Sequence, residues 1–308
     1  MNPLRALLLW MSHSPSWQRR ISSWPATRRV VARFMPGEKL DEAVAAARQL
    51  NAAGMSASLN PLGEHVGDEA TAAAAADEYV GILERIESEG LDANISVKLS
   101  QLGLDLSHEL TVGNLSRILE DALRRDNFVR IDMESSAYVE PTLRIYEQLH
   151  DRFANLGVVI QAYLRRTADD IERLIPLAAP IRLVKGAYME PAEIAFPKKA
   201  DVDRNYARQL ERLLDGGARS HGVKVAVATH DTNLIDRAKE LIGQRQIDSG
   251  VEFQMLYGIR RDVQRQLVAE GLPLRIYVSY GVSWYAWFMR RLAERPANLT
   301  FFLRNLLR

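Results

Sequence analysis

The sequence predicts an α/β fold, a distorted (β/α)8 barrel of the TIM type, and two observations indicate it. Short apolar runs of strand length alternate with longer amphipathic runs, and this pattern occurs eight times without two neighbouring strands in succession. Eight parallel strand–helix units usually close into a barrel of about 250 residues. The 308 residues therefore leave room for an N-terminal helical cap over residues 1–38, a barrel domain over residues 39–308 and an extra C-terminal helix.

The predicted strands are rich in Val and Ile, as buried strands usually are. They span residues 55–60, 94–99, 129–133, 157–162, 181–185, 223–229, 251–255 and 274–278. Helical patterns follow them or precede them over residues 40–53, 69–89, 114–125, 141–153, 168–177, 203–214, 234–242, 260–270, 284–293 and 297–307. The alternative is an open doubly wound sheet, which usually carries a glycine-rich phosphate turn after its first strand. No such turn follows Asn60.

Composition excludes several kinds of function. Lys plus Arg number 40 and Asp plus Glu number 39, so the net charge of +1 argues against a nucleic-acid partner. The chain has no cysteine, which excludes disulfides, thiolate catalysis and cysteine-ligated metals. Its six histidines are scattered without zinc-ligand spacing, so no metal site is expected.

No apolar run reaches the roughly 18 residues that a membrane span requires. Trp10, Trp17 and Trp24 lie among Arg and Ser residues near the N-terminus. They are typical either of a helix that packs on the main domain or of an interfacial membrane helix.

One phase of the predicted strands is polar, although strands buried on both faces usually read as continuous apolar runs. The polar phase includes Ser96, Lys98, Arg130, Asp132, Glu252, Gln254, Arg275 and Tyr277. These residues gather toward the C-terminal strand ends, where barrel enzymes build their sites. So many charges in a barrel interior need one another or a ligand, because a buried unpaired charge costs several kcal/mol.

The charges near the strand ends and in the last helical segments are mostly basic. Lys98, Arg182, Lys185, Arg290 and Arg291 are opposed by Asp132, Glu252 and Glu294. Such a set suits an anionic ligand, for example a carboxylate or a phosphate. In the predicted strand 181–185, Arg182 and Lys185 have opposite phases, so we expect one of them to lie beyond the strand.

Several motifs occur in a characteristic order: Ile95-Ser-Val-Lys-Leu-Ser100, Ile131-Asp-Met-Glu134, Gln161-Ala-Tyr163, Arg182-Leu-Val-Lys-Gly-Ala-Tyr188, Ala228-Thr-His-Asp231, Glu252-Phe-Gln-Met-Leu-Tyr-Gly258 and Arg290-Arg-Leu-Ala-Glu294. From about Glu38 to the C-terminus, the chain with these motifs resembles the proline dehydrogenase family, in its short monofunctional bacterial form. The resemblance implies a distorted barrel with non-covalent FAD above the C-terminal strand ends. It implies oxidation of L-proline to Δ1-pyrroline-5-carboxylate, the first step of proline catabolism to glutamate, with electrons passed to a quinone.

The resemblance also implies roles for residues at matching motif positions. Asp132 and Arg182 would be catalytic, with Arg182 against the flavin near N5. The substrate would contact Lys98, Tyr277, Trp287, Arg290 and Arg291, the two arginines pairing with its carboxylate. FAD would contact Met133, Gln161, Arg182, Lys185, Gly186, Ala187, Thr229 and His230. Glu64 resembles a gating carboxylate that pairs with Arg290.

Two residues depart from the family pattern. Trp287 stands where the family often has Tyr, which removes a hydroxyl and adds ring volume near the substrate. Asn60 stands where the family usually has Asp, so that a charge is lost. Both changes bear on substrate preference.

Two other functions compete with this hypothesis. Lys98 and Lys185 end predicted strands, and a desolvated lysine can serve a Schiff-base lyase or aldolase. A non-catalytic barrel could instead bind the dehydrogenase that consumes pyrroline-5-carboxylate. For the leading hypothesis we expect a cytoplasmic enzyme, transient contact with that dehydrogenase, and peripheral contact with the inner face of the plasma membrane, where a quinone is reached.

Overall fold

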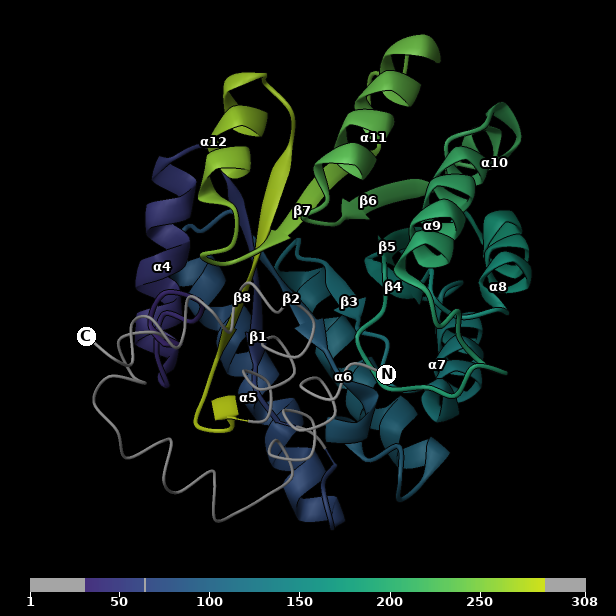
Figure 1. Ribbon diagram of the computed structural model, residues 1–308. Helices are drawn as coiled ribbons and strands as arrows, with labels where there is room; N and C mark the ends of the chain where they lie inside the picture. The colour runs from purple at the N-terminus through teal and green to yellow at the C-terminus, as the bar shows by residue number, and fades with distance from the viewer. Residues whose placement is uncertain (1–30, 64, 286–308) are drawn as a thin grey trace, which may run out of the picture.

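A closed barrel of eight parallel strands, with helices around its outside, forms the part of the chain that the structure describes (Figure 1). The computed structural model describes residues 31–63 and 65–285. The strands are β1 (Ser56–Pro61), β2 (Ala93–Val97), β3 (Val129–Ile131), β4 (Leu156–Gln161), β5 (Pro180–Val184), β6 (Lys224–Ala228), β7 (Val251–Leu256) and β8 (Leu274–Tyr280). Each strand pairs with its sequence neighbours and β8 pairs with β1, which confirms the barrel and excludes the open sheet.

The helices alternate with the strands as the sequence predicts. They are α4 (Leu40–Ala52), α5 (Glu69–Ser88), α6 (His108–Arg124), α7 (Ser136–Leu149), α8 (Thr167–Leu174), α9 (Lys199–Leu213), α10 (Gly216–Ser220), α11 (Thr232–Gln244) and α12 (Arg261–Ala269), with short 3-10 helices η1 (Leu99–Leu102) and η2 (Ile175–Leu177). No helix in this part of the chain is long and apolar enough to cross a membrane.

Most predicted boundaries agree within two residues, and the larger differences have local causes. Helix α6 begins six residues earlier than predicted, because the Ser107 side chain accepts a hydrogen bond from the Leu110 N–H and caps the helix there. Helix α7 begins five residues earlier than predicted, where the Ser136 N–H donates to Glu190, and it contains Pro141 in its second turn. The smaller shift at the predicted strand 94–99, which ends two residues early at Val97, arises because Lys98 and Leu99 turn into η1.

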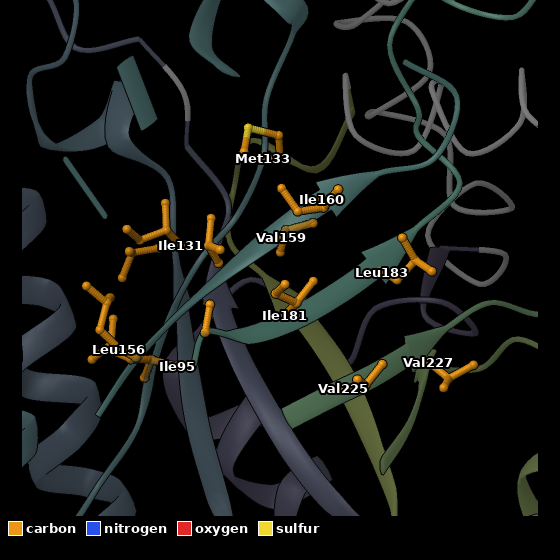
Figure 2. Packing of buried hydrophobic residues seen from close by; sticks show 14 of the residues in the cluster. Ile95, Ile131, Met133, Leu156, Val159, Ile160, Ile181, Leu183, Val225 and Val227 are labelled. Carbon is orange, nitrogen blue, oxygen red and sulfur yellow. The ribbon is translucent and has the colours of Figure 1, made fainter. Parts of the chain in front are cut away.

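The apolar phase of the strands packs outward against the helices. Ile95, Ile131, Ile181, Leu183 and Val227 are fully buried. Figure 2 shows Ile181 and Leu183 on β5 and Val225 and Val227 on β6, each pair at alternate positions of its strand. This layer follows from the alternation of side chains along a strand, and it leaves the polar phase for the interior.

Residues 31–38 pack against the end of the barrel. The Gly281 N–H donates to the Gly37 carbonyl at 3.3 Å, and Trp284 Nε1 donates to Glu38 Oε1 at 3.1 Å. The boundary expected at residue 38 stays a prediction, because most of the proposed cap lies outside the described residues, as do nearly all of the helical stretches expected over 284–293 and 297–307.

Candidate active site

Asp132 lies at the centre of a polar cluster inside the barrel. It follows β3 directly, and its Oδ1 accepts a hydrogen bond from Arg182 Nη1 at 2.9 Å. Its Oδ2 accepts one from the Tyr277 hydroxyl at 2.5 Å and lies 3.5 Å from Lys98 Nζ. One carboxylate thus joins Lys98, just after β2, with side chains from the middle of β5 and β8, and the predicted site residues Lys98, Asp132, Arg182 and Tyr277 do come together.

Arg182 is held on three sides. Besides Asp132, it donates through Nη2 to Ser96 Oγ at 3.1 Å, and its guanidinium lies over the Tyr277 ring with 5.2 Å between Cζ and the ring centroid. The residue is only 4% exposed, and its Nε has no hydrogen-bond partner among the residues that the structure describes. A buried donor of this kind normally has an acceptor, which favours a ligand on this side of the cluster.

The Tyr277 hydroxyl acts as a donor. Burial raises its pKa well above the ordinary tyrosine value, and the nearby negative charge of Asp132 raises it further. The hydroxyl therefore stays protonated at neutral pH and holds its hydrogen bond to Asp132.

Lys98 and Asn60 form the side of the cluster at β1 and β2. Lys98 Nζ donates to Asn60 Oδ1 at 3.3 Å, and Asn60 Nδ2 donates to the Ser96 carbonyl at 2.9 Å. Lys98 is 8% exposed and Asn60 is fully buried. Asn60 thus contacts the predicted substrate lysine without adding a second negative charge beside Asp132.

A second layer of charge lies deeper in the barrel. Arg130 Nη1 donates to the Pro180 carbonyl at 2.7 Å, and Arg275 Nε donates to Glu252 Oε2 at 3.3 Å. Burial lowers the pKa of Arg130 to about 9, and the like charge of Arg182 contributes to this shift. The polar side chains of the strands therefore form two layers: these deeper residues, which we call the barrel floor, and the cluster around Asp132 above them.

Lys185 lies beyond the end of β5, so it is the one of Arg182 and Lys185 that leaves the strand. Its Nζ donates to Asp203 Oδ1 at 2.5 Å and to Asp231 Oδ2 at 2.7 Å. Asp203 belongs to α9, and Asp231 is the N-cap of α11. Burial raises the pKa of Asp231, but hydrogen bonds from Lys185 and Lys199 outweigh this effect and lower the pKa to about 2.

Gly186 requires glycine for two reasons. Its φ of +110° lies in the left-handed region, and an added Cβ would fall 2.1 Å from Cδ1 of Tyr163. The Tyr163 N–H donates to the Lys185 carbonyl at 2.8 Å, so the turns after β4 and β5 lie against each other. Ala187 and Tyr188 continue this turn, and a cleft of about 300 Å³ opens beside it between Tyr163, Tyr188 and Phe196.

The predicted cofactor residues of β4 and β6 also lie at the strand ends. Gln161 is buried and donates from Nε2 to the Glu134 carbonyl at 2.7 Å. Thr229 is buried after β6, and the N–H of Leu256 donates to His230 Nε2 at 2.9 Å. Because Nε2 accepts this bond, the neutral imidazole carries its proton on Nδ1.

Met133 lies past the end of β3 and is largely buried (Figure 2). The residue after it, Glu134, is buried and accepts hydrogen bonds from the backbone and side chain of Ser100. Ser100 and Glu134 both lie within sequence motifs, but the sequence assigns neither of them a role. Their positions, each two residues past a predicted site residue, were a signal that could have identified them.

Some predicted site residues cannot be placed. Glu64, Trp287, Arg290 and Arg291 lie outside the described residues. Within the described ranges, no group of three or more His, Asp or Glu side chains is arranged to hold a metal ion.

Comparison with known proteins gives a consistent result. The family model described as proline dehydrogenase matches residues 43–304. The chain is 41% identical over 307 residues to proline dehydrogenase 1 of Bacillus subtilis subsp. natto, covering 99% of both chains. It is 39% identical over 282 residues to proline dehydrogenase of Deinococcus radiodurans, covering 90% of this chain and 89% of that one.

The fold also matches a domain of larger proteins. A crystal structure of proline utilization A from Bdellovibrio bacteriovorus, inactivated by N-propargylglycine, superimposes with a TM-score of 0.80 at 25% identity. The match covers 87% of this chain and 33% of that one. Bifunctional protein PutA of Escherichia coli is 30% identical over 327 residues, covering 90% of this chain and 24% of its own length.

Proposed function

The chain belongs to the proline dehydrogenase family, and from this premise we propose that it oxidises L-proline to Δ1-pyrroline-5-carboxylate with FAD as cofactor. In this reaction the C5–H bond of proline breaks and its electron pair leaves as hydride. The amine nitrogen loses its proton and forms the C5=N double bond. When bound, FAD supplies the acceptor for that hydride at N5.

The residues at the strand ends fit such a cofactor. The buried Arg182 Nε lacks an acceptor in the described part of the chain, and a guanidinium can donate to a flavin ring nitrogen or oxygen. The left-handed turn at Gly186 brings the backbone close to any ligand above β5. Met133, Gln161, Ala187, Thr229 and His230 would complete the contacts, and Lys185, held by two carboxylates, would supply a cation near the pyrophosphate.

Asp132 carries the proposal for substrate binding. Its carboxylate holds Lys98, Arg182 and Tyr277 in one arrangement. We propose that Lys98 and Tyr277 line the proline pocket, with Trp287 as a further wall. Because positioned groups convert binding into alignment, this arrangement would hold C5 of proline toward the flavin.

The proline carboxylate would pair with Arg290 and Arg291, and Glu64 would close the site by pairing with Arg290. This part of the proposal rests on the motif Arg290-Arg-Leu-Ala-Glu294. Two guanidiniums suit a carboxylate because each can donate two parallel hydrogen bonds.

The fate of the electrons and of the product implies partners. We propose a quinone as electron acceptor, which requires contact with the membrane surface from the cytoplasmic side. The E. coli relative is named a bifunctional protein, and a pyrroline-5-carboxylate dehydrogenase would consume the product through transient contact.

The Schiff-base alternative is disfavoured by the contacts of the two lysines. Lys98 lies beside Asp132, and Lys185 donates to both Asp203 and Asp231. An ammonium held by carboxylates is not a nucleophile, because nucleophilic attack needs the free amine.

The cofactor part of the proposal is tested by heat-denaturing the purified protein and identifying the released chromophore by absorbance and mass. Release of FAD in a near-stoichiometric amount is the expected result. A colourless protein that fails to bind added FAD would contradict the proposal.

A further inference from the structure

Glu134 is a buried carboxylate outside the set of proposed substrate and cofactor residues. It is 3% exposed, and Ser100 is fully buried. Glu134 Oε1 accepts a hydrogen bond from the Ser100 backbone N–H at 3.1 Å, and Oε2 accepts one from the Ser100 hydroxyl at 2.6 Å. One carboxylate thus binds both donors of a single residue 34 positions away in the chain.

The hydrogen bonds connect two strand ends at equivalent places. Ser100 is two residues past Lys98, and Glu134 is two residues past Asp132. The Asp132 N–H also donates to the Val97 carbonyl at 2.8 Å, which gives the two segments a second attachment. Lys98 and Asp132 are therefore bracketed by backbone and side-chain contacts on both sides.

A third strand end joins the same point. Gln161, the last residue of β4, donates from Nε2 to the Glu134 carbonyl at 2.7 Å. The ends of β2, β3 and β4 are thus linked through Glu134. The Ser100 N–H lies in the first turn of η1, where backbone donors have no partner within the helix, so the carboxylate also caps this turn.

Burying a carboxylate is costly unless hydrogen bonds or an opposite charge compensate it. Charge-assisted hydrogen bonds are short and strong, as the 2.6 Å contact is. Glu134 lies next to the cluster around Asp132 and not on an outer helix. This position suits a residue that fixes the spacing between strand ends.

We propose that Glu134 is a positioning residue for proline oxidation, which sets the spacing between Lys98 and Asp132 by holding Ser100. It does not contact the substrate itself. The proposal rests on the substrate-binding roles proposed above for Lys98 and Asp132, whose Nζ and Oδ2 atoms lie 3.5 Å apart.

The test is a comparison of Glu134→Gln, Ser100→Ala and the double variant by steady-state kinetics with L-proline. Because small displacements of positioned groups are costly in catalysis, we expect Glu134→Gln to raise the KM for proline about tenfold, with a smaller fall in kcat. Ser100→Ala should raise KM about threefold, since the backbone hydrogen bond stays. If Glu134 acts through Ser100, the double variant should have a KM no higher than that of Glu134→Gln, because coupled residues are not additive.

Asp121→Asn is the matched control. Asp121 is also buried, but it accepts hydrogen bonds from Arg124 and Arg125 at the C-terminal end of α6. The Asp121→Asn variant should have a lower unfolding temperature than wild type and a KM within about twofold of wild type, because Asp121 has only a structural role.

A folded Glu134→Gln variant with wild-type KM would overturn the proposal, as would a KM effect that adds fully to that of Ser100→Ala. Should Glu134→Gln fail to fold, Ser100→Ala alone decides: an unchanged KM overturns the proposal. A wild-type protein without proline-dependent activity would instead contradict the proposed function, so the two failures are distinguishable.

Discussion

At the scale of single residues, Asp132 shows how one side chain organises several others. Its carboxylate contacts Arg182 on β5, Tyr277 on β8 and Lys98, which follows β2. Two cations beside one anion leave a net positive charge in a largely buried place. Such an excess suits a substrate that carries a carboxylate and a cofactor that accepts a negative charge.

Tyr277→Phe tests the hydroxyl of this cluster. The ring can keep its place beside the Arg182 guanidinium, while Asp132 loses one donor. We expect the KM for proline to rise about tenfold or more, because a hydrogen bond to a charged group contributes roughly 1.5 kcal/mol or more and about 1.4 kcal/mol corresponds to a factor of ten. Steady-state kinetics measures this change.

Tyr206→Phe is the control for that variant. The buried Tyr206 hydroxyl donates to the Leu183 carbonyl at 3.0 Å, on the outer side of β5. The Tyr206→Phe variant should lose about as much stability as Tyr277→Phe, while its KM for proline stays unchanged. Equal kinetic effects in both variants would show that the Tyr277 hydroxyl has no special role.

The sequence predicts which side chains face the barrel interior better than it predicts their hydrogen-bond partners. The phase of β2, β3 and β8 predicts that Lys98, Asp132 and Tyr277 face the interior, because side chains alternate along a strand. The partners of Lys185 could not be predicted, since Asp203 and Asp231 come from two helices whose orientation depends on packing. Glu134 and Ser100 likewise meet only because η1 turns the chain after β2.

At the scale of elements, the turns after the strands carry the site. The segment after β5 lies against the segment after β4, since the N–H of Phe196 donates to the Tyr163 carbonyl at 2.8 Å. Glu190 connects the same segment to the start of α7, accepting hydrogen bonds from the Ser136 N–H and hydroxyl at 2.6 Å each. Loops held in this way can present Gly186 and its neighbours at a fixed height above the barrel.

Gly186→Ala tests whether this turn is required. The φ of +110° costs a non-glycine residue about 1–3 kcal/mol, and the new Cβ would overlap the Tyr163 ring. We expect a lower unfolding temperature and weaker FAD binding, measured by thermal unfolding and by flavin fluorescence titration.

Gly113→Ala is the control for Gly186→Ala, because here an added side chain is tolerated. Gly113 lies inside α6, and an added Cβ would meet no atom within 4 Å. Because Ala is the better helix former, this variant should gain about 0.5–1 kcal/mol of stability and keep its FAD affinity. If Gly186→Ala bound FAD as tightly as wild type, the turn would have no part in the cofactor site.

Element boundaries show where sequence patterns lose information. Strand β7 was predicted within one residue, because its apolar run is bounded clearly. The start of α6 was missed, because its first turn, His108-Glu-Leu-Thr111, lacks the apolar periodicity of the rest. The short helix α10 was also missed, since two glycines open it and the Asp215 cap decides its start.

At the scale of the whole molecule, closure of the barrel places the C-terminal ends of all eight strands at one face. Strand β8 pairs with β1 over six residue positions, so the first and last strands support each other (Figure 1). The count of eight units predicted this closure, because eight parallel units seldom form any other arrangement. The segments outside the described residues leave the roles of Glu64, Trp287, Arg290 and Arg291 as predictions.

Global stability should depend on pH through Asp231. Folding lowers the pKa of this carboxyl from 3.8 to about 2, because the hydrogen bonds from Lys185 and Lys199 outweigh the effect of burial. A group with a lowered pKa stabilises the fold fully above its unfolded pKa, and this stabilisation is lost as the pH falls toward 2. Asp231→Asn should therefore be less stable than wild type at neutral pH, and the difference should shrink between about pH 4 and pH 2.

Urea unfolding of both proteins at several pH values measures this difference. Asn can still cap α11, so the comparison isolates the charge. A difference in unfolding free energy that stays constant from pH 7 to pH 2 would show that the ion pairs with the two lysines do not stabilise the fold.

We propose that the cluster around Asp132 holds L-proline against a bound flavin. The most direct test of this claim is the visible absorption spectrum of the purified protein before and after anaerobic addition of L-proline. We expect an oxidised flavin spectrum that bleaches when proline is added, since hydride transfer reduces the cofactor without another acceptor. A flavin that dithionite reduces and proline leaves oxidised would contradict the claim.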